Sequence, residues 1–388
     1  MAVEFLGAGY GNPSTETTPL VGPVWDPGYT REIARAHEAS GWDHVLFPYA
    51  SDGPDPAQAA AWAAAHTDQI QLRVAHRPNV SAPTFAAKTF ATLDTASGGR
   101  VTVHLIAGGL TSDQLAEGDT LDKDARYDRL AEYAQVLLQS WTSTGPFTHV
   151  GPYYRAQDFV LRARSEQRPG LSAGGASRRA LEVGARVADV FAFFGEPLAA
   201  TAQQVNLLSS SAAAAGRPTP RLQIAFRPIV APTDDEAWAK AHAIKARIDA
   251  LASPRAIRTL TEAPREPGKL PENTANLRLA ELAASGDRHD RALWTPTVAG
   301  AGGLPTSATA LVGSYRTVAD ALLDYVDLGF EIFGLRGYDL LADAVEFGEN
   351  VIPLVHAGVA VRGHSGTPQP AITPRASSSS VIRRASSA

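Results

Sequence analysis

Cysteine is absent from the 388 residues of the chain. Its absence excludes disulfide bonds, a thiolate nucleophile and metal sites built on cysteine, and it is compatible with a reducing compartment. Long apolar runs are missing as well, because none approaches the roughly 20 residues of a membrane span. The first residues, MAVEFLGAGYG, lack the basic start and long apolar core of a signal peptide and are typical of a first strand. We therefore expect a soluble cytoplasmic protein.

An excess of positive charge is also missing. The formal net charge is −5 and the basic residues are scattered, which argues against a nucleic-acid or anionic-membrane surface. The sequence has no zinc-spaced His/Glu cluster, no P-loop and no G-x-S-x-G motif, so we predict no metal site. Apolar residues, in contrast, make up 44% of the chain, enough for one large α/β domain or two smaller ones.

Short β-rich runs alternate with segments of helical periodicity along most of the chain. Helices are predicted near Tyr29–Ser40, Ala57–His66 and Ala82–Ser97, the last one ending at the pair Gly98-Gly99. Eight strands separated by helices favour a parallel (β/α)8 TIM barrel, whose catalytic groups lie at the C-terminal ends of the strands. The predicted strands are Val3–Leu6, His44–Phe47, Gln71–Ala75, Val101–Ala107, Gly170–Ala173, Val190–Phe194, Leu222–Val230 and Ile332–Leu335.

An open doubly wound sheet is the alternative architecture. It would more often show G-x-G-x-x-G after the first strand, leading into a helix. Here the glycine-rich segment Gly7–Gly11 is followed by polar turn residues instead. The pattern therefore favours the barrel.

Three segments do not fit a minimal strand-helix repeat. Ser143–Arg155 predicts a small hairpin. Ser253–Thr309 is rich in proline, glycine and charge and too long for a passive connector, so we predict a lid. Gly363–Ala388 has almost no apolar content, which predicts a tail that is disordered or exchanged with a neighbouring subunit. Residues 1–362 would then form a single barrel domain.

Short motifs recur along the chain in an order that carries a family resemblance. One stretch contains Arg77-Pro78, Ser81-Ala82-Pro83-Thr84, Thr92-Leu93-Asp94 and Ser97-Gly98-Gly99-Arg100. The others are Asp122 with Arg126-Tyr127, Gly174-Gly175-Ala176-Ser177, Gly195-Glu196-Pro197, Asp235-Glu236-Ala237-Trp238, Ala310-Leu311-Val312-Gly313 and Gly337-Tyr338. By their order and spacing over residues 3–357, the chain resembles the bacterial-luciferase-like flavin monooxygenases, most closely the alkanesulfonate monooxygenase branch.

The resemblance implies a two-component enzyme on a (β/α)8 barrel. Reduced FMN would be supplied by a separate NAD(P)H:flavin reductase, and O2 would be the co-substrate. The expected reaction is the oxygenation of a small organosulfur compound, a sulfonate or sulfone, or a related polar substrate, through a flavin peroxide. A homodimer or homotetramer is expected.

A phosphate site is predicted at Gly174, Gly175, Ala176 and Ser177, which follow a strand and open a helix. Backbone N–H groups, the helix dipole and the Ser177 hydroxyl would converge there on the FMN phosphate. The alternative is a plain helix cap, which requires the same residue types. By the resemblance, Lys123 and Tyr127 would add a cation and a hydroxyl to the same site, and Lys123 stands where the branch commonly has histidine.

Three further residues are expected to contact the flavin ring. His104 occupies a position where the branch often has Asn, and Ala107 lies on the same predicted strand. His76, at the end of the third strand, is expected to point to the mouth of the barrel. A core histidine at position 104 and an ordinary polar strand end at position 76 are the alternatives.

The predicted substrate site departs most from the branch. Its Arg-x-His pair falls on Ala225 and Arg227, its later arginine falls near Leu304, and its second-strand cysteine falls near Gly53. Arg227 is the predicted replacement, able to bind an anion or stabilise a peroxide but a poor general base.

Tyr338 matches the active-site tyrosine of the branch and is the second predicted catalytic residue. Its phenol could donate to a peroxide or a substrate oxygen, or it could be a buried aromatic with a satisfied hydroxyl. Arg336 would be an anion partner on the same rim, unless it only pairs with Asp339.

Tyr10, Trp25 and Phe194 are predicted to line the substrate site, although plain core packing would explain aromatic residues at such positions nearly as well. Two other functions stay open. One is a reductase or dehydrogenase that uses the deazaflavin F420, and the other is a flavin-binding protein without turnover.

Overall fold

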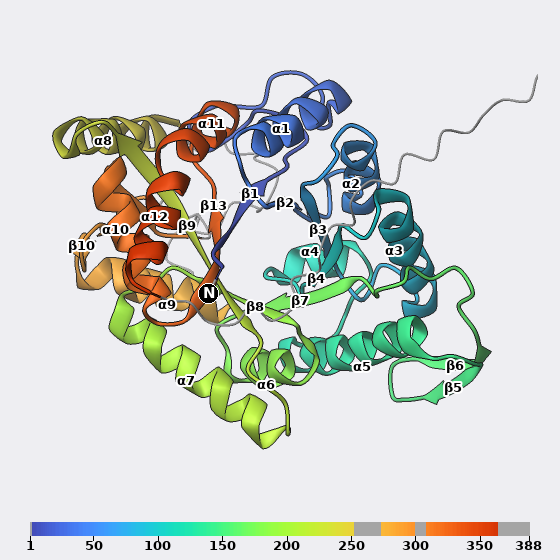
Figure 1. The fold of residues 1–388 in the computed structure, drawn as a ribbon. Helices are drawn as coiled ribbons and strands as arrows, with labels where there is room; N and C mark the ends of the chain where they lie inside the picture. The colour runs from blue at the N-terminus through green and yellow to red at the C-terminus, as the bar shows by residue number, and fades with distance from the viewer. Residues whose placement is uncertain (1, 252–272, 299–307, 364–388) are drawn as a thin grey trace, which may run out of the picture.

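Eight parallel strands form a closed barrel in the computed structural model, which describes residues 2–251, 273–298 and 308–363 (Figure 1). Each strand pairs with the next in the order β1-β2-β3-β4-β7-β8-β9-β13, and β13 pairs with β1 to close the ring. The barrel strands are β1 Glu4–Ala8, β2 His44–Phe47, β3 Gln71–His76, β4 Val101–Leu105, β7 Gly170–Gly174, β8 Val190–Phe194, β9 Arg221–Ala231 and β13 Phe330–Leu335. The predicted barrel and its eight strands are confirmed, with shifts of a few residues at the strand ends.

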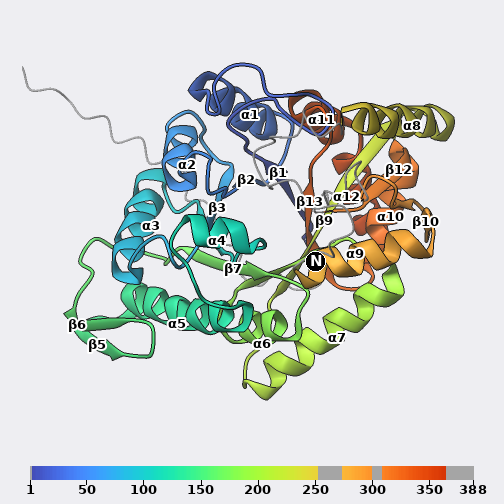
Figure 2. The same ribbon diagram turned by 180° about the vertical axis from the view of Figure 1, so that it is seen from behind.

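Helices surround the barrel in both views of the ribbon (Figures 1 and 2). Several begin where the sequence provides a cap. Asp26 accepts from the backbone N–H of Gly28, and Asp55 accepts from that of Ala57. The helices are α1 Pro27–Ala39, α2 Pro56–Ala64, α3 Pro83–Ser97, α4 Thr111–Ala116, α5 Lys123–Thr142, α6 Arg178–Val187, α7 Leu198–Ala214, α8 Asp234–Leu251, α10 Tyr315–Val326, α11 Leu340–Asn350 and α12 Ile352–Val361.

The glycine stop of α3 is where the sequence predicts it. Gly98 follows the last helical residue with φ of +77°, a left-handed conformation that glycine adopts at little cost. The short helix α4, in contrast, was not predicted. Among the described residues no helix is both long enough and apolar enough to cross a membrane.

The strands of the barrel have an apolar outer face and a mixed inner face, which holds both polar side chains and the apolar cluster of Leu6, Val190 and Ile332. Side chains alternate along a strand, so Phe5 and Val45 pack in the core outside the barrel while their neighbours point inward. Arg73 of β3 donates to Gln223 of β9, and because these strands are not neighbours the contact crosses the interior. The interior therefore holds a buried cation in addition to branched apolar residues of the kind that usually fill such barrels.

Beyond the barrel, the chain forms a hairpin and a small side sheet. The hairpin consists of β5 Phe147–Val150 and β6 Arg155–Phe159, which confirms the prediction and extends it by a few residues. The side sheet consists of β10 Arg288–His289, β11 Leu293–Trp294 and β12 Ala310–Ser314. β12 pairs in parallel with residues 227–231 of β9, whereas residues 222–226 of β9 pair with β13.

Part of the predicted lid can be compared with the structure. Residues 252–272 and 299–307, which include Leu304, lie outside the described residues. The rest of the segment forms α9 Thr274–Ser285 and the strands β10 and β11. The predicted tail also lies outside the described residues from position 364 on. The lid, the tail and the division of the chain at residue 362 stay predictions.

Candidate active site at the carboxyl end of the barrel

The candidate site is a ring of polar side chains at the carboxyl ends of the parallel strands. Tyr10 follows β1, Phe194 ends β8, Arg227 lies in the outer half of β9 and Arg336 follows β13. Parallel strands bring these positions to one end of the barrel, where the loops after the strands assemble active sites in this fold. Of the side chains that the sequence assigned to the substrate, Arg227 and Arg336 meet at Glu16, and Arg336 lies beside the ring of Tyr10.

The centre of the site is a carboxylate between two guanidinium groups. Arg227 Nη2 donates to Glu16 Oε2 at 2.7 Å, and Arg336 Nη2 donates to Glu16 Oε1 and Oε2 at 3.1 and 2.9 Å. Burial alone would raise the pKa of Glu16, but the charges of Arg227 and then Arg336 hold that pKa well below its usual range. Glu16 is therefore ionised at neutral pH, and the predicted alternative of an Arg336–Asp339 pair is not what the structure shows.

Arg227 keeps unused hydrogen-bond donors although its side chain is only 2% exposed. Its Nη2 also donates to the carbonyl of Gly337 at 3.2 Å, while Nε and Nη1 have no partner among the described residues. Arg336 Nε is buried and without a partner in the same way. Buried donors of this kind are normally satisfied, so these three nitrogen atoms mark a place for an acceptor.

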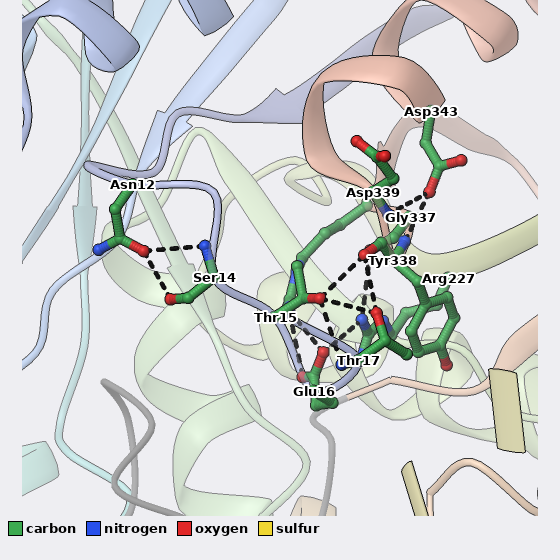
Figure 3. A network of polar contacts seen from close by, with 11 residues as sticks. Asn12, Ser14, Thr15, Glu16, Thr17, Arg227, Gly337, Tyr338, Asp339 and Asp343 are labelled. Atoms are coloured by element: carbon green, nitrogen blue, oxygen red, sulfur yellow. Dashed lines mark hydrogen bonds and ion pairs between the residues drawn. The ribbon is translucent and has the colours of Figure 1, made fainter. Parts of the chain in front are cut away.

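The loop that carries Glu16 is docked on the backbone of Tyr338 (Figure 3). The hydroxyls of Thr15 and Thr17 donate to the carbonyl oxygen of Tyr338 at 2.9 and 3.2 Å. The Tyr338 N–H in turn donates to Asp343 Oδ2 at 2.6 Å. These bonds fix the carboxylate of Glu16 and the backbone of Tyr338 relative to each other.

The Tyr338 ring lies under Arg227, whose guanidinium carbon is 3.8 Å from the ring centroid. The side chain is buried, and burial raises the pKa of Tyr338, an effect that Arg227 partly opposes. Its phenol is therefore protonated at neutral pH. A protonated phenol in this position can serve as a hydrogen-bond or proton donor.

A small cavity of about 40 Å³ lies next to the carboxylate cluster. It is lined by Tyr10, Asn12, Phe47, Gly53 and Ala59 among others, and its lining is mostly apolar. The ring of Tyr10 is shared with the cluster, because the Arg336 guanidinium lies 5.0 Å from its centroid. A single water molecule needs about 10–15 Å³ of such volume, so the cavity has room for roughly three groups of that size.

Trp25 is 37% exposed and donates from Nε1 to Thr30 Oγ1 at 3.1 Å, at the edge of this cavity. The cavity borders Val24, the residue before Trp25, while Trp25 itself is not part of its lining. Its predicted contact with substrate stays a prediction.

Residues 174–177 form the turn between β7 and α6 and cap the helix, and their predicted phosphate role stays a prediction. β7 ends at Gly174, Gly175 has φ of +143°, and the Ser177 hydroxyl caps α6 by accepting from Ala180 N at 3.1 Å. A Cβ on Gly175 would lie 2.8 Å from the hydroxyl oxygen of Tyr127, so a side chain would fill the cradle. The cap and the open cradle occur together, and Tyr127 of α5 faces both.

Lys123 begins α5, one turn before Tyr127. Its Nζ donates to Thr274 Oγ1 of α9 at 2.6 Å. The amine thus joins the start of α5 to the start of α9 on the same side of the barrel. Its predicted role at the phosphate stays a prediction.

His104 lies inside the barrel and is neutral. Its Nδ1 is 2.9 Å from Ser172 Oγ, and burial together with the charge of Arg73 lowers the pKa of His104 to about 3. Its ring also lies near Gly174, the first residue of the cradle. Ala107 lies beyond the end of β4 at Leu105, so the predicted strand is two residues too long and the side chain belongs to the following loop.

The predicted direction of His76 is wrong. Its Nε2 is 2.7 Å from the hydroxyl of Tyr133 on α5, and its ring contacts that of Phe90 on α3 at 5.1 Å between centroids. The side chain therefore points outward to the helices because it shares a face of β3 with Leu72 and Val74. Burial lowers the pKa of His76 to about 4, so it is a neutral packed histidine and not a group at the barrel mouth.

Three polar residues of the rim were not predicted as site residues. Glu16 is one, and nothing in its local sequence marks it. Glu117, after α4, accepts hydrogen bonds from Arg77 Nη1, after β3, and from the hydroxyl of Tyr49, after β2. The three loops are thereby connected. The amide of Gln114 is fully buried against Gly108, with neither polar atom partnered in the part of the chain that the structure describes.

Comparison with known proteins gives a consistent result. A family model described as luciferase-like monooxygenase matches residues 8–331. A riboflavin lyase, solved with a modified FMN and riboflavin, is similar at a TM-score of 0.73 and 21% identity, covering 97% of this chain and 95% of that one.

Two other solved structures have the same architecture. An EDTA monooxygenase from a Chelativorans species has a TM-score of 0.72 and 18% identity, covering 92% of this chain and 94% of its own. An F420-dependent secondary alcohol dehydrogenase, solved with an F420-acetone adduct, has a TM-score of 0.64 and 17% identity, covering 92% and 99%. Likenesses at this level of identity establish the fold.

Proposed function

The chain belongs to the luciferase-like monooxygenase family, and from this premise we propose that it is a flavin-dependent monooxygenase acting on a small organosulfur or related polar substrate. The proposed cofactor is reduced FMN from a separate NAD(P)H:flavin reductase, with O2 as co-substrate. The proposed assembly is a cytoplasmic homodimer or homotetramer. The alkanesulfonate branch is the proposed relationship within the family.

The observation that carries the substrate proposal is the buried Arg227 with its two unpartnered nitrogen atoms. A guanidinium stays protonated under all ordinary conditions, so Arg227 binds acceptors and does not take up a proton. Together with Arg336 Nε it offers donors to the oxygen atoms of a sulfonate, sulfone or similar group. Tyr10 and Phe194 border the same end of the barrel and would contact the apolar part of the substrate.

The residues of the phosphate cradle fit FMN. The absence of a side chain at Gly175 lets Tyr127 and Ala180 approach its backbone closely, Ser177 and the first turn of α6 provide hydroxyl and N–H groups, and Tyr127 adds a second hydroxyl. His104 lies inside the barrel near Gly174, and Ala107 lies in the loop after β4; both are proposed to contact the ring. Reduced FMN, when bound, would react with O2 and supply the oxygen-transferring chemistry.

The chain itself would supply binding, orientation and one proton. Tyr338 holds a proton on its hydroxyl at neutral pH because burial raises its pKa, so it is the proposed donor to an oxygen atom of the reacting groups. Arg227 lies against the Tyr338 ring and stabilises negative charge that develops next to it. His104 is neutral near pH 7, because burial and the charge of Arg73 lower its pKa to about 3.

An anaerobic titration with reduced FMN tests the proposal, followed by admission of O2 with a panel of sulfonates, sulfones and other polar compounds. Binding at micromolar concentration and substrate-dependent oxygen uptake are expected. Failure to bind reduced FMN would refute the proposal.

The F420 alternative has a solved fold neighbour in its support. It predicts an absorbance change of F420 with an alcohol or similar substrate and no oxygen uptake. Turnover with neither cofactor, despite tight binding of one of them, would instead indicate a binding protein.

A further inference from the structure

We propose that Glu16 is a specificity-determining residue, which cancels one of the two positive charges of Arg227 and Arg336 and so selects a substrate group with a single negative charge. The inference rests on the proposed function, because it assigns the two arginines to the substrate. It goes further by naming the charge of the group that the site accepts and the residue that sets this charge.

Some N–H groups of the two arginines donate to Glu16, and others have no partner among the described residues. Both arginines turn their Nη2 atoms to the Glu16 carboxylate, at distances of 2.7 to 3.1 Å. Arg227 Nε, Arg227 Nη1 and Arg336 Nε have no partner among the described residues. Glu16 therefore occupies one acceptor position of the pair and leaves donors for one more acceptor group.

The charges of the cluster lead to the same conclusion. Two guanidinium groups and one carboxylate sum to a single positive charge. A singly charged anion would bring this sum to zero, whereas a doubly charged anion would leave an uncompensated negative charge beside the buried Arg227, in a site where the side chains of Glu16 and Arg336 are only 25% and 22% exposed. Because the interaction between charges strengthens as the local dielectric constant falls, the second negative charge is disfavoured.

Glu16 is held in place as a permanent part of the site. Its neighbours Thr15 and Thr17 both donate to the carbonyl oxygen of Tyr338, and Thr15 and Thr18 form a backbone bridge with N···O distances of 2.9 and 3.1 Å. These bonds hold the backbone that carries Glu16, and the two ion pairs hold its carboxylate against the arginines. In the proposal the substrate anion binds beside Glu16 and not in its place.

The test compares the affinities of full-length variants, with and without FMN, for methanesulfonate and ethanedisulfonate by isothermal titration calorimetry. The wild type is expected to prefer the singly charged anion. Glu16→Gln keeps the shape of the side chain and removes its charge, so the preference for ethanedisulfonate over methanesulfonate should rise by about tenfold or more. Glu331→Gln is the control, since it makes the same charge change beside Arg221 at the opposite end of β13.

A second variant keeps the test decisive if Glu16→Gln destabilises the fold. Arg336→Gln removes one positive charge and should weaken methanesulfonate binding by about tenfold. The double variant Glu16→Gln/Arg336→Gln restores the single positive charge and should recover much of that affinity. Circular dichroism establishes that each variant is folded before titration.

The possible results separate the inference from the proposed function. If Glu16→Gln shifts neither affinity while Arg336→Gln weakens both, the arginines bind substrate but Glu16 does not set the charge, and the inference is wrong. If Arg336→Gln changes the affinity for no anion while reduced FMN still binds, the substrate site lies elsewhere and the inference fails with it. If FMN does not bind at all, the proposed function itself fails.

Discussion

The guanidinium of Arg227 lies against the ring of Tyr338, 3.8 Å from carbon to centroid, and both side chains are buried. The Arg227 cation therefore lies on the same ring that carries the phenolic proton of Tyr338, at the carboxyl end of the barrel. A cation over an aromatic face is stabilised most when it is desolvated, as here. The pairing makes the two predicted catalytic residues dependent on each other.

Replacing Tyr338 by Phe should keep this pairing and remove only the phenolic proton. We expect kcat with the best substrate of the panel to fall by about 100-fold, the lower end of the range for general acid catalysis, with the affinity for reduced FMN unchanged. Tyr153→Phe on the β5–β6 connection is the control. Equal rates for Tyr338→Phe and the wild type would exclude a proton-donor role.

Substitution of Gly175 by Ala should weaken FMN binding. The new Cβ would lie 2.7 Å from Ala180 Cβ and 2.8 Å from the Tyr127 hydroxyl oxygen, and the left-handed φ adds strain. Gly216→Ala is the matched control, because Gly216 also has positive φ but no atom near the new Cβ. We expect both variants to lose stability by about 1 kcal/mol or more, and only Gly175→Ala to lose FMN affinity in a fluorescence titration.

His104 should make the protein less stable in acid. Burial lowers its pKa to about 3, so between about pH 6.5 and pH 3 the unfolded state binds more protons and the free energy of unfolding falls as the pH falls. The slope from this one residue is at most about 1.4 kcal/mol per pH unit. His104→Gln should flatten the slope in urea denaturation, whereas Ser172→Ala, which keeps the imidazole, should not.

Gly337→Ala should destabilise the rim, because a Cβ there would overlap the carboxylate of Asp343. The expected cost is about 1 to 3 kcal/mol in the free energy of unfolding, typical of overpacking. Gly334→Ala on the preceding strand β13 is the control, since its nearest neighbours would lie at an ordinary 3.5 Å. Similar stability of the two variants in urea would show that the Asp343 contact is not tight.

Local pattern predicted the barrel well. The strands have apolar outer faces and the helices between them have caps, so a short window of sequence carries the signal for each element. The stop at Gly98 needed only the pair of glycines. The small side sheet was missed because β10 and β11 have two residues each, too few for any periodicity.

The candidate site residues were predicted mainly through the family resemblance. Arg227 falls on the Arg-x-His pair of the branch, and Arg336 stands two residues before Tyr338, which matches the tyrosine of the branch. Glu16 could not be found this way, because its partners are 211 and 320 residues away and its loop has no repeating pattern. For His76, the alternation of side chains from Leu72 and Val74 indicates the outer face of β3. Its place at the end of the strand suggests the mouth of the barrel instead, and that prediction is wrong.

The division of β9 between two sheets has a consequence for slow local motion. Residues 222–226 are bonded to the barrel strand β13, while Arg227–Ala231 are bonded to β12 of the side sheet. The two halves can therefore belong to different cooperative units in amide hydrogen exchange. Opening of the side sheet alone would release the backbone of Arg227 while the barrel stays closed. The affinity for an anion would then depend on whether the side sheet is intact, although that sheet is not part of the barrel.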